Sequence, residues 1–467
     1  AVDFNPTSGQ RSCLRDPQLV KTAPKIRAIA IRFAAFFMID NDHKINPFSP
    51  DFSHRVDELY ENKDNPIKKL NKNGQNPGME EALLLTTKQL LPKIKSKLPQ
   101  HFNAHCIVSQ KAFEQCTSET LALWKAQNFP AETVLSLTGG LGVDDWAWNK
   151  SGSAVTSLDP DAQLNAVVQQ NWKRLQMDAQ RITTTAEDWL KANSALQFHL
   201  IYIDPDRRPL GGRKSHQAED YLPNVFALLQ LYGKMGKNWL IKLSPMTDPH
   251  WIFHRLDCYT EIFSMGFRNE AKEILVWVDP SRKRSEVPRI DCIEITELNS
   301  HFGEGEGSLD PSNTENETQI GDITASWIKG ERFSELDLEA LAEHATDLIW
   351  EPSPALFASS LHTTISQRFH LLAATPNPGF FHTRREIPAA FGRCLLVHHT
   401  FQGSLRKIAQ QIKTLNISQL NVTPRSCGIP TQEIAKILQL KDGGPHTLFI
   451  TKKQNEFQAW LGEIKKF

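Results

Sequence analysis

Between about residues 133 and 279, short apolar segments alternate with segments of helical periodicity, and this alternation is the strongest constraint on the fold. Short apolar runs separated by helices indicate βαβ units and a parallel sheet that is covered on both faces. The sequence therefore predicts an α/β, Rossmann-like domain over residues 131–280, closed by the last two strands as an antiparallel edge hairpin. The expected strands are 133–137, 154–159, 181–185, 199–204, 238–244, 259–264 and 273–279.

The N-terminal part is expected to contain an extension or linker over residues 1–78 and a helical segment over 79–130. Residues 79–98 have acidic residues first and lysines last, which suits the macrodipole of a helix. A second helix is expected near Thr117, with Thr117 or Ser118 as its cap. The run 61–78 is rich in Asn, Lys and Pro, as is typical of a linker.

The second half of the chain separates its charges. Residues 301–345 carry eleven acidic and two basic residues, whereas residues 393–467 carry eleven Lys or Arg and four Asp or Glu. The neutral total of the chain therefore conceals an acidic middle and a basic tail. The tail again alternates strands and helices, ending in an expected helix over 455–466, and predicts a small C-terminal α/β domain. Between the two α/β domains, we expect an insert and acidic linker over 281–322 and a helical connector over 323–392.

The seven cysteines are scattered and include no C-x-x-C pair. This usage favours a reduced, cytoplasmic setting, and we predict no metal site. No apolar run approaches the roughly 20 residues that a spanning helix needs, so we predict no membrane segment. No feature of the sequence indicates an oligomeric state.

A glycine-rich turn follows the first predicted strand, in the segment LSLTGGLGVDD over residues 135–145. Gly139, Gly140 and Gly142 let the backbone turn sharply and approach a ligand, and the following helix offers free N–H groups. The alternative is a tight βα turn without a ligand. The third position of a dinucleotide fingerprint would be Asp145, beside which a pyrophosphate fits poorly. A ligand without phosphate, such as S-adenosylmethionine, tolerates acidic residues there.

Acidic residues follow the next strands. Asp159 ends the second strand, where a carboxylate can accept hydrogen bonds from both ribose hydroxyls, although the segment Asp-Pro-Asp is also typical of a turn. Glu187 or Asp188 follows the third strand and is a candidate contact of an adenine edge, or a simple helix cap. These side chains are expected at the carboxyl edge of the sheet, where open α/β sheets bind ligands.

The fourth strand leads into IDPDRRP, which places Asp204, Asp206, Arg207 and Arg208 at the same edge. Lys242 ends the fifth strand beside them. The sequence predicts that these five residues carry the chemistry, with Asp204 orienting or deprotonating a nucleophile and an arginine holding a substrate phosphate. The alternatives are an ion-pair loop of structural use and an ordinary lysine at the end of a strand.

Together, LTGGLGVD, SLDPD, IDPDRRP and IKLSPM, preceded by EQCTSETLALWKA, resemble the class I methyltransferases of Bacteroidetes-type bacteria that carry a C-terminal THUMP-like domain. The resemblance covers about residues 79–467, including EPSPALF and LQLKDGGPHTLFIT. It implies a Rossmann-like methyltransferase domain, a ferredoxin-like insert near 275–320 and a THUMP-like domain that holds RNA. The implied cofactor, S-adenosylmethionine, would contact Thr138, Gly139, Gly140, Gly142, Asp159 and Asp204.

More distantly, the chain is similar to trimethylguanosine synthases, whose segment ahead of the glycine loop approaches the cofactor. The matching residues here are Thr117, Ser118 and Glu119, so Thr117 and Glu119 become candidate cofactor contacts. Two positions depart from the family pattern. Ser136 stands where an acidic residue usually precedes the glycine turn, and the loop at Asp204 lacks the aromatic residue that stacks a flipped base.

These patterns predict an S-adenosylmethionine-dependent methyltransferase that modifies RNA, either tRNA or rRNA. The basic tail independently suits contact with phosphates, although a solvated surface or a dimerisation module has the same composition. Two other hypotheses remain open: a methyltransferase acting on a small molecule or a protein, and a non-catalytic RNA-binding protein with a vestigial cofactor fold.

Overall fold

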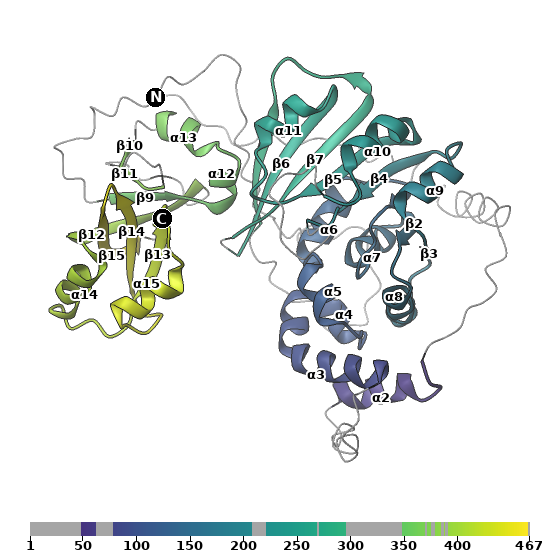
Figure 1. The fold of residues 1–467 in the computed structure, drawn as a ribbon, viewed down its shortest axis with the longest axis horizontal. Helices are drawn as coiled ribbons and strands as arrows, with labels where there is room; N and C mark the ends of the chain where they lie inside the picture. Colours follow the sequence, from purple (N-terminus) through teal and green to yellow (C-terminus); the bar gives the residue numbers. More distant parts are fainter. Residues whose placement is uncertain are drawn as a thin grey trace, which may run out of the picture. The chain divides into compact units, whose positions relative to one another are not determined.

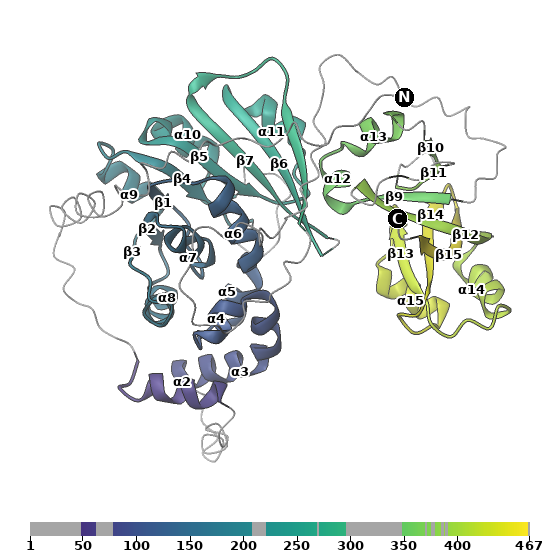
Figure 2. The same ribbon diagram turned by 180° about the vertical axis from the view of Figure 1, so that it is seen from behind.

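The structure is a computed structural model, and it divides into two compact units. The first contains residues within 1–243, 256–260 and 276–284, and the second contains residues within 244–255, 261–275 and 285–467. Figures 1 and 2 show the ribbon from two opposite sides. The residues that the structure describes are 48–61, 78–207, 221–268, 270–295, 348–368, 371–374, 379–383, 387 and 391–465.

Five parallel strands position the candidate site in the first unit. They are β1 (Thr133–Ser136), β2 (Ala154–Asp159), β3 (Gln180–Thr183), β4 (Phe198–Ile203) and β5 (Gly236–Leu243), in the order β3-β2-β1-β4-β5. The neighbouring strands pair in parallel, as the sequence predicted. The order reverses between β1 and β4, so the loops that leave these two strands meet at a topological switch point.

Helices connect these strands as the alternating pattern predicted. They are α7 (Val143–Lys150), α8 (Ala162–Arg174), α9 (Ala186–Ala192) and α10 (Val225–Tyr232), which continues into the short 3-10 turn η2 (Gly233–Met235). The side chain of Asp161 caps α8 by accepting a hydrogen bond from the backbone N–H of Leu164. Such caps satisfy backbone donors that have no partner within the helix.

The sheet order continues beyond β5 as β7-β6-β8. The strand β6 (Cys258–Phe267) precedes β7 (Glu270–Lys283) by two residues, and a connection this short requires an antiparallel pair, as predicted. The hairpin is not the edge of the sheet, however, because β8 (Arg289–Ile295) pairs in parallel with β6. This part of the expected insert at 281–322 therefore belongs to the sheet, and residues 296–322 lie outside the described residues. The helix α11 (Pro249–Arg255) precedes β6.

The N-terminal helices are α2 (Phe52–Tyr60), α3 (Met79–Lys97), α4 (Pro99–Asn103), α5 (Gln110–Gln115) and α6 (Glu119–Asn128). As predicted, α3 places acidic residues in its first turn and lysines in its last, and Ser118 caps α6. Within the expected extension, α2 was not anticipated. Its Phe52, Val56 and Leu59 pack with Leu84 of α3 in one buried cluster. Most of the expected linker at 61–78 lies outside the described residues.

The second unit contains a seven-stranded sheet in the order β10-β11-β9-β12-β15-β14-β13. Its strands are β9 (Leu348–Pro352), β10 (Leu372–Ala373), β11 (Phe381–Thr383), β12 (Gly392–Gly403), β13 (Asn421–Arg425), β14 (His446–Lys453) and β15 (Glu456–Lys465). The stretch 323–392, expected as a helical connector, thus contributes β9 to β11 besides the short helices α12 (Pro354–Ala358) and α13 (His362–Arg368).

The helix expected at the C-terminal end is wrong, because these residues form β15. This strand pairs with both β12 and β14, and residues 459–462 are buried between them. Glu, Ala, Leu and Lys favour a helix locally, but two partner strands supply backbone hydrogen bonds that the local sequence does not reveal.

The two helices of the tail appear where the sequence predicted them. They are α14 (Leu405–Lys413) and α15 (Thr431–Leu438). The apolar residues Leu405, Ile408 and Ile412 recur at helical spacing and join one buried core with Ile434 and Leu448. Among the described residues, no helix combines the length and apolar character needed to span a bilayer.

Candidate functional site

The glycine loop joins β1 to α7 at the switch point, and a different physical constraint favours glycine at each of its three glycine positions. An added Cβ at Gly139 would lie 1.9 Å from Nη1 of Arg181 and 2.2 Å from Oγ of Ser157. At Gly142, with φ of 79°, it would lie 2.8 Å from the indole nitrogen of Trp172. Gly140 has φ of 50°, and an added Cβ there would meet no protein atom within 4 Å. Gly140 therefore leaves open space beside the loop.

A buried network of ionic and polar groups supports this loop. The guanidinium of Arg181 donates to the carbonyl oxygen of Gly140 at 2.7 Å, to Oγ of Ser157 at 2.7 Å and to Oδ1 of Asn165 at 2.7 Å. Its Nη1 also lies 3.4 Å from Oδ2 of Asp145, and both side chains are 1% exposed. The buried guanidinium of Arg181 thus fixes the backbone of the loop.

Burial dominates the ionisation of this pair. It raises the pKa of the Asp145 carboxyl, although Arg181 and Ser157 oppose that shift, and it lowers the pKa of Arg181. Asp145 therefore contacts Ser157 and Arg181 in the interior and does not line the space beside Gly140. Ser136, which replaces the usual strand-end acid, is also fully buried and lies near the Asp145 carboxyl.

Asp159 lies where the sequence predicted, at the end of β2 and against the glycine loop. Its Oδ2 accepts a hydrogen bond from the backbone N–H of Gly140 at 2.9 Å, and its Oδ1 accepts one from the backbone N–H of Asp161 at 3.0 Å. The side chain is 14% exposed. A carboxylate offers about four acceptor positions, so Asp159 retains acceptor capacity for a ligand after these two bonds.

A second group of charges connects the ends of β4 and β5. Nζ of Lys242 lies 2.6 Å from Oδ2 of Asp204 and donates to Oγ1 of Thr117 at 3.0 Å. The backbone N–H of Asp204 donates to Oγ1 of Thr138 at 2.7 Å, which ties this loop to the glycine loop. The structure thus brings together four of the predicted site residues, Thr117, Thr138, Asp204 and Lys242.

The same group extends inward to residues that the sequence analysis missed. Nζ of Lys125, which is 0% exposed, lies 2.7 Å from Oδ1 of Asp144. It also donates to Oγ1 of Thr117 at 3.4 Å, and the hydroxyl of Tyr202 donates to Oδ2 of Asp144 at 3.0 Å. Burial raises the pKa of Asp144, but Lys125, Lys242 and these hydrogen bonds outweigh it and lower the pKa overall.

The sequence does contain a signal for two of the missed residues, Lys125 and Arg181. Lys125 interrupts the buried apolar face of α6, between Trp124 and Ala126, and a lysine in that position needs a partner. Arg181 similarly lies within a short strand of the sheet. The partners themselves are distant in sequence, so the sequence indicates a buried charge without identifying its counter-ion.

The remaining predicted residues lie apart from this group or make other contacts. The carboxylate of Glu119 is buried and accepts hydrogen bonds from the backbone N–H groups of Gln100 and His101 at 2.9 Å each, so it caps α4. Glu187 is exposed at the start of α9, where Asp188 forms a reciprocal cap with Thr185.

In the loop after β4, Asp206 exchanges two backbone hydrogen bonds with Leu222, at 2.8 and 3.1 Å. Arg207 follows it, and Arg208 lies outside the described residues. The first residues of this loop are therefore fixed at two points. Asp204 is hydrogen-bonded to Thr138, and Asp206 is hydrogen-bonded to Leu222.

Residues 392–463 match the family model described as THUMP domain-like. The C-terminal domain is THUMP-like. The predicted resemblance of this part of the chain is thereby confirmed, and its sheet contains β12 to β15 together with β9 to β11. Among the curated proteins, no sequence matches the chain.

The solved structures show where the fold recurs. A protein of Porphyromonas gingivalis W83, described as a candidate methyltransferase, is 18% identical with a TM-score of 0.65, over 89% of this chain and 99% of that chain. This likeness shows a shared fold over nearly the whole length. The predicted α/β architecture, with a large, mainly parallel sheet and a C-terminal THUMP-like domain, is thereby confirmed. The tRNA (uracil-54, C5)-methyltransferase of Pyrococcus abyssi is 15% identical over 37% of this chain and 41% of its own, with a TM-score of 0.27.

Proposed function

We propose that the chain is an S-adenosylmethionine-dependent methyltransferase that modifies RNA, with its active site at the switch point between β1 and β4. The observation that carries the proposal is the convergence of three features at one sheet edge: the glycine loop, the Asp159 carboxylate and the Asp204–Lys242 pair. Ligands of open α/β sheets bind at such an edge.

The residues present fit the proposed cofactor. Gly140 combines a left-handed backbone with open space, so a ligand atom can approach the peptide closely. Asp159 lies against Gly140 with acceptor capacity left for the two ribose hydroxyls. When bound, S-adenosylmethionine supplies a methyl group on a sulfonium, which a nucleophile displaces in line. Thr138 belongs to the same loop and would also contact the cofactor.

Asp204 is the proposed catalytic carboxylate. Its side chain is 32% exposed, so it can reach a substrate, while Lys242 at 2.6 Å and the backbone bond to Thr138 hold it in place. It would accept a hydrogen bond from the nucleophile, or its proton, as the methyl is transferred. Lys242 acts as a positioning residue, because its ammonium contacts the carboxylate of Asp204. Thr117 acts as a second positioning residue, because its hydroxyl accepts a hydrogen bond from the same ammonium. Arg207 and Arg208 are proposed to hold a substrate phosphate, and Asp206 to orient them.

The THUMP-like domain supports RNA as the substrate. Eight of its basic side chains are exposed, and they lie on α14, α15, β14 and β15 or in adjoining turns: Arg406, Lys407, Lys413, Lys436, Lys441, Lys452, Lys453 and Lys465. Exposed lysines and arginines contact phosphates and release counterions, which gives affinity without sequence preference. The sequence of the RNA would then be selected by the substrate side of the active site.

Mass spectrometry of nucleosides from total RNA tests this function. Cells with and without the gene are compared, and a methylated nucleoside is expected to disappear with the gene and return when it is restored. Restoration with Asp204→Asn is expected to leave the nucleoside absent. An unchanged nucleoside profile would favour a small-molecule or protein substrate, and undetectable cofactor binding would favour a non-catalytic RNA-binding protein.

A further inference from the structure

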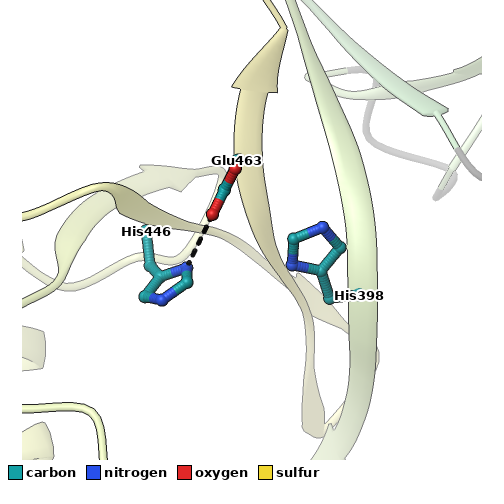
Figure 3. A group of neighbouring side chains, drawn as sticks. All are labelled: His398, His446 and Glu463. Atoms are coloured by element: carbon teal, nitrogen blue, oxygen red, sulfur yellow. Dashed lines mark ion pairs between the residues drawn. The ribbon is translucent and has the colours of Figure 1, made fainter.

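Three side chains that are distant in sequence meet on the seven-stranded sheet: His398 of β12, His446 of β14 and Glu463 of β15 (Figure 3). Each offers one ligand atom, and these atoms all lie within 4.8 Å of one another. Across the residues that the structure describes, this is the group of His, Cys, Asp and Glu with the geometry to hold a metal ion. No metal site was predicted from the sequence, because these residues lie far apart in the chain and form no local ligand motif.

Strand register places the three side chains on one face. His446 and Glu463 are directly paired across β14 and β15, and Glu463 is also paired with Leu396 of β12. Directly paired residues point to the same face of a sheet. Residues alternate along a strand, so His398, two positions after Leu396, returns toward that face. Three adjacent strands thus each contribute one potential ligand.

A β-bulge adjusts the position of His398. The register pairs Val397 with Gly462 and His399 with Leu461, which leaves His398 as the extra residue. Bulges re-aim a side chain and recur beside functional sites. The strands β12 and β15 lie in close contact at Gly462, where an added Cβ would lie 1.8 Å from the carbonyl oxygen of Leu396. This contact lies directly beside the bulge that carries His398.

The chemistry of the donors selects the kind of ion. Nδ1 of His446 is buried and makes no hydrogen bond to any described residue, and it lies 3.8 Å from Oε1 of Glu463. That separation is too long for a hydrogen bond. It is close to the roughly 3.3 Å between two ligands that each lie about 2.0 Å from one tetrahedral ion. Two imidazoles and a carboxylate suit zinc and its neighbours better than magnesium or calcium.

We propose that His398, His446 and Glu463 bind a divalent transition-metal ion of the zinc class. Three protein ligands leave at least one coordination position open, for water or for an oxygen of an external ligand. His446 is 32% exposed and Glu463 is 52% exposed, so an ion reaches the site from solvent and the side chains can close on it. The proposal concerns the THUMP-like domain and goes beyond methyl transfer, on which it does not depend.

Zinc titration of the full chain, freed of any histidine tag and stripped of metal, tests the site. Calorimetry and competition with a chromogenic chelator are expected to show one zinc site that His446→Ala and Glu463→Gln each weaken at least tenfold. His399→Ala is the matched control, because His399 is an exposed histidine beside the bulge whose ring stacks on Phe401. That variant is expected to bind zinc as the wild type does.

A further readout separates the site from adventitious binding. Zinc is expected to raise the melting temperature of the wild type, but not of Glu463→Gln, because an ion that binds only the folded state stabilises it. Zinc affinity unchanged in both His446→Ala and Glu463→Gln, or weakened equally by His399→Ala, would overturn the proposal.

Discussion

The two regions proposed to act together place their charges in opposite environments. At the switch point of the first unit, Lys125 and Arg181 are buried and each lies against an aspartate. On the THUMP-like domain, Lys452 and Lys453 are exposed. A buried charge holds a geometry that water and salt cannot disturb, whereas an exposed charge attracts phosphates from a distance and is screened by salt. Under the proposed function, the buried charges would hold the active site in place and the exposed charges would attract RNA.

The largest expected effect comes from removing a buried cation. Lys125→Met leaves the carboxylate of Asp144 buried without its ammonium, and breaking a buried pair in this way costs about 3–5 kcal/mol. Lys452→Met, the exposed control, is expected to change the free energy of unfolding by less than about 0.5 kcal/mol. Urea denaturation measures both values. Similar losses in the two variants would mean that the two charge environments are not distinct.

The next effect concerns the cofactor. Gly140→Ala is expected to weaken S-adenosylmethionine binding at least tenfold, because its Cβ would enter the space beside the loop. Gly152→Ala is the matched control, since Gly152 also has positive φ, at 95°, and an added Cβ there meets nothing within 4 Å. In both variants, alanine must adopt a positive φ, so the cost to the free energy of folding is comparable. Calorimetry distinguishes them, and equal affinities would remove Gly140 from the cofactor site.

A smaller effect is expected from the exposed charges. Replacing Arg406, Lys407 and Lys413 on α14 by Gln removes three positive charges while leaving its buried face intact. The slope of log affinity for RNA against log salt should fall by about 2, and the affinity for the cofactor should not change. Binding assays at several salt concentrations measure the slope. An unaltered slope would show that α14 does not contact RNA.

The smallest effect is a pH dependence in the second unit. Burial raises the pKa of Glu294 to about 7, although hydrogen bonds with the side chain of Ser353 and the backbone of Ala355 oppose the shift. The folded state therefore binds more protons than the unfolded state between about pH 4.5 and 7, so stability falls as pH rises through this window. Glu294→Gln should remove that fall in denaturation curves recorded across pH. A fall of the same size in the variant would assign it to another group.

The sequence predicted the elements whose signals are local. The strands β1 to β5, the glycine loop and the cap at Ser118 follow from periodicity and residue type. The identity of β15 did not, because its partners β12 and β14 lie elsewhere in the chain. Local propensity is a weak guide wherever a strand obtains its hydrogen bonds from distant segments.

The same limit applies to the site. Asp159, Asp204 and Lys242 were predicted because strand ends of a parallel sheet share one edge, and the structure places them there. The pairs Lys125–Asp144 and Arg181–Asp145 join α6 or β3 to α7, so only the fold reveals them. Glu119 shows the converse, since its motif suggested a ligand contact and its carboxylate caps α4.

Methyl transfer to RNA by Asp204→Asn tests the central claim most directly. RNA from cells that lack the gene is incubated with S-adenosylmethionine labelled in its methyl group, and the initial rate and the cofactor affinity are measured for wild type and variant. The wild type should label RNA, and the variant should lose at least about 100-fold in rate while its cofactor affinity stays within about threefold. Labelling by the variant at the wild-type rate, or no labelling by the wild type, would contradict the account.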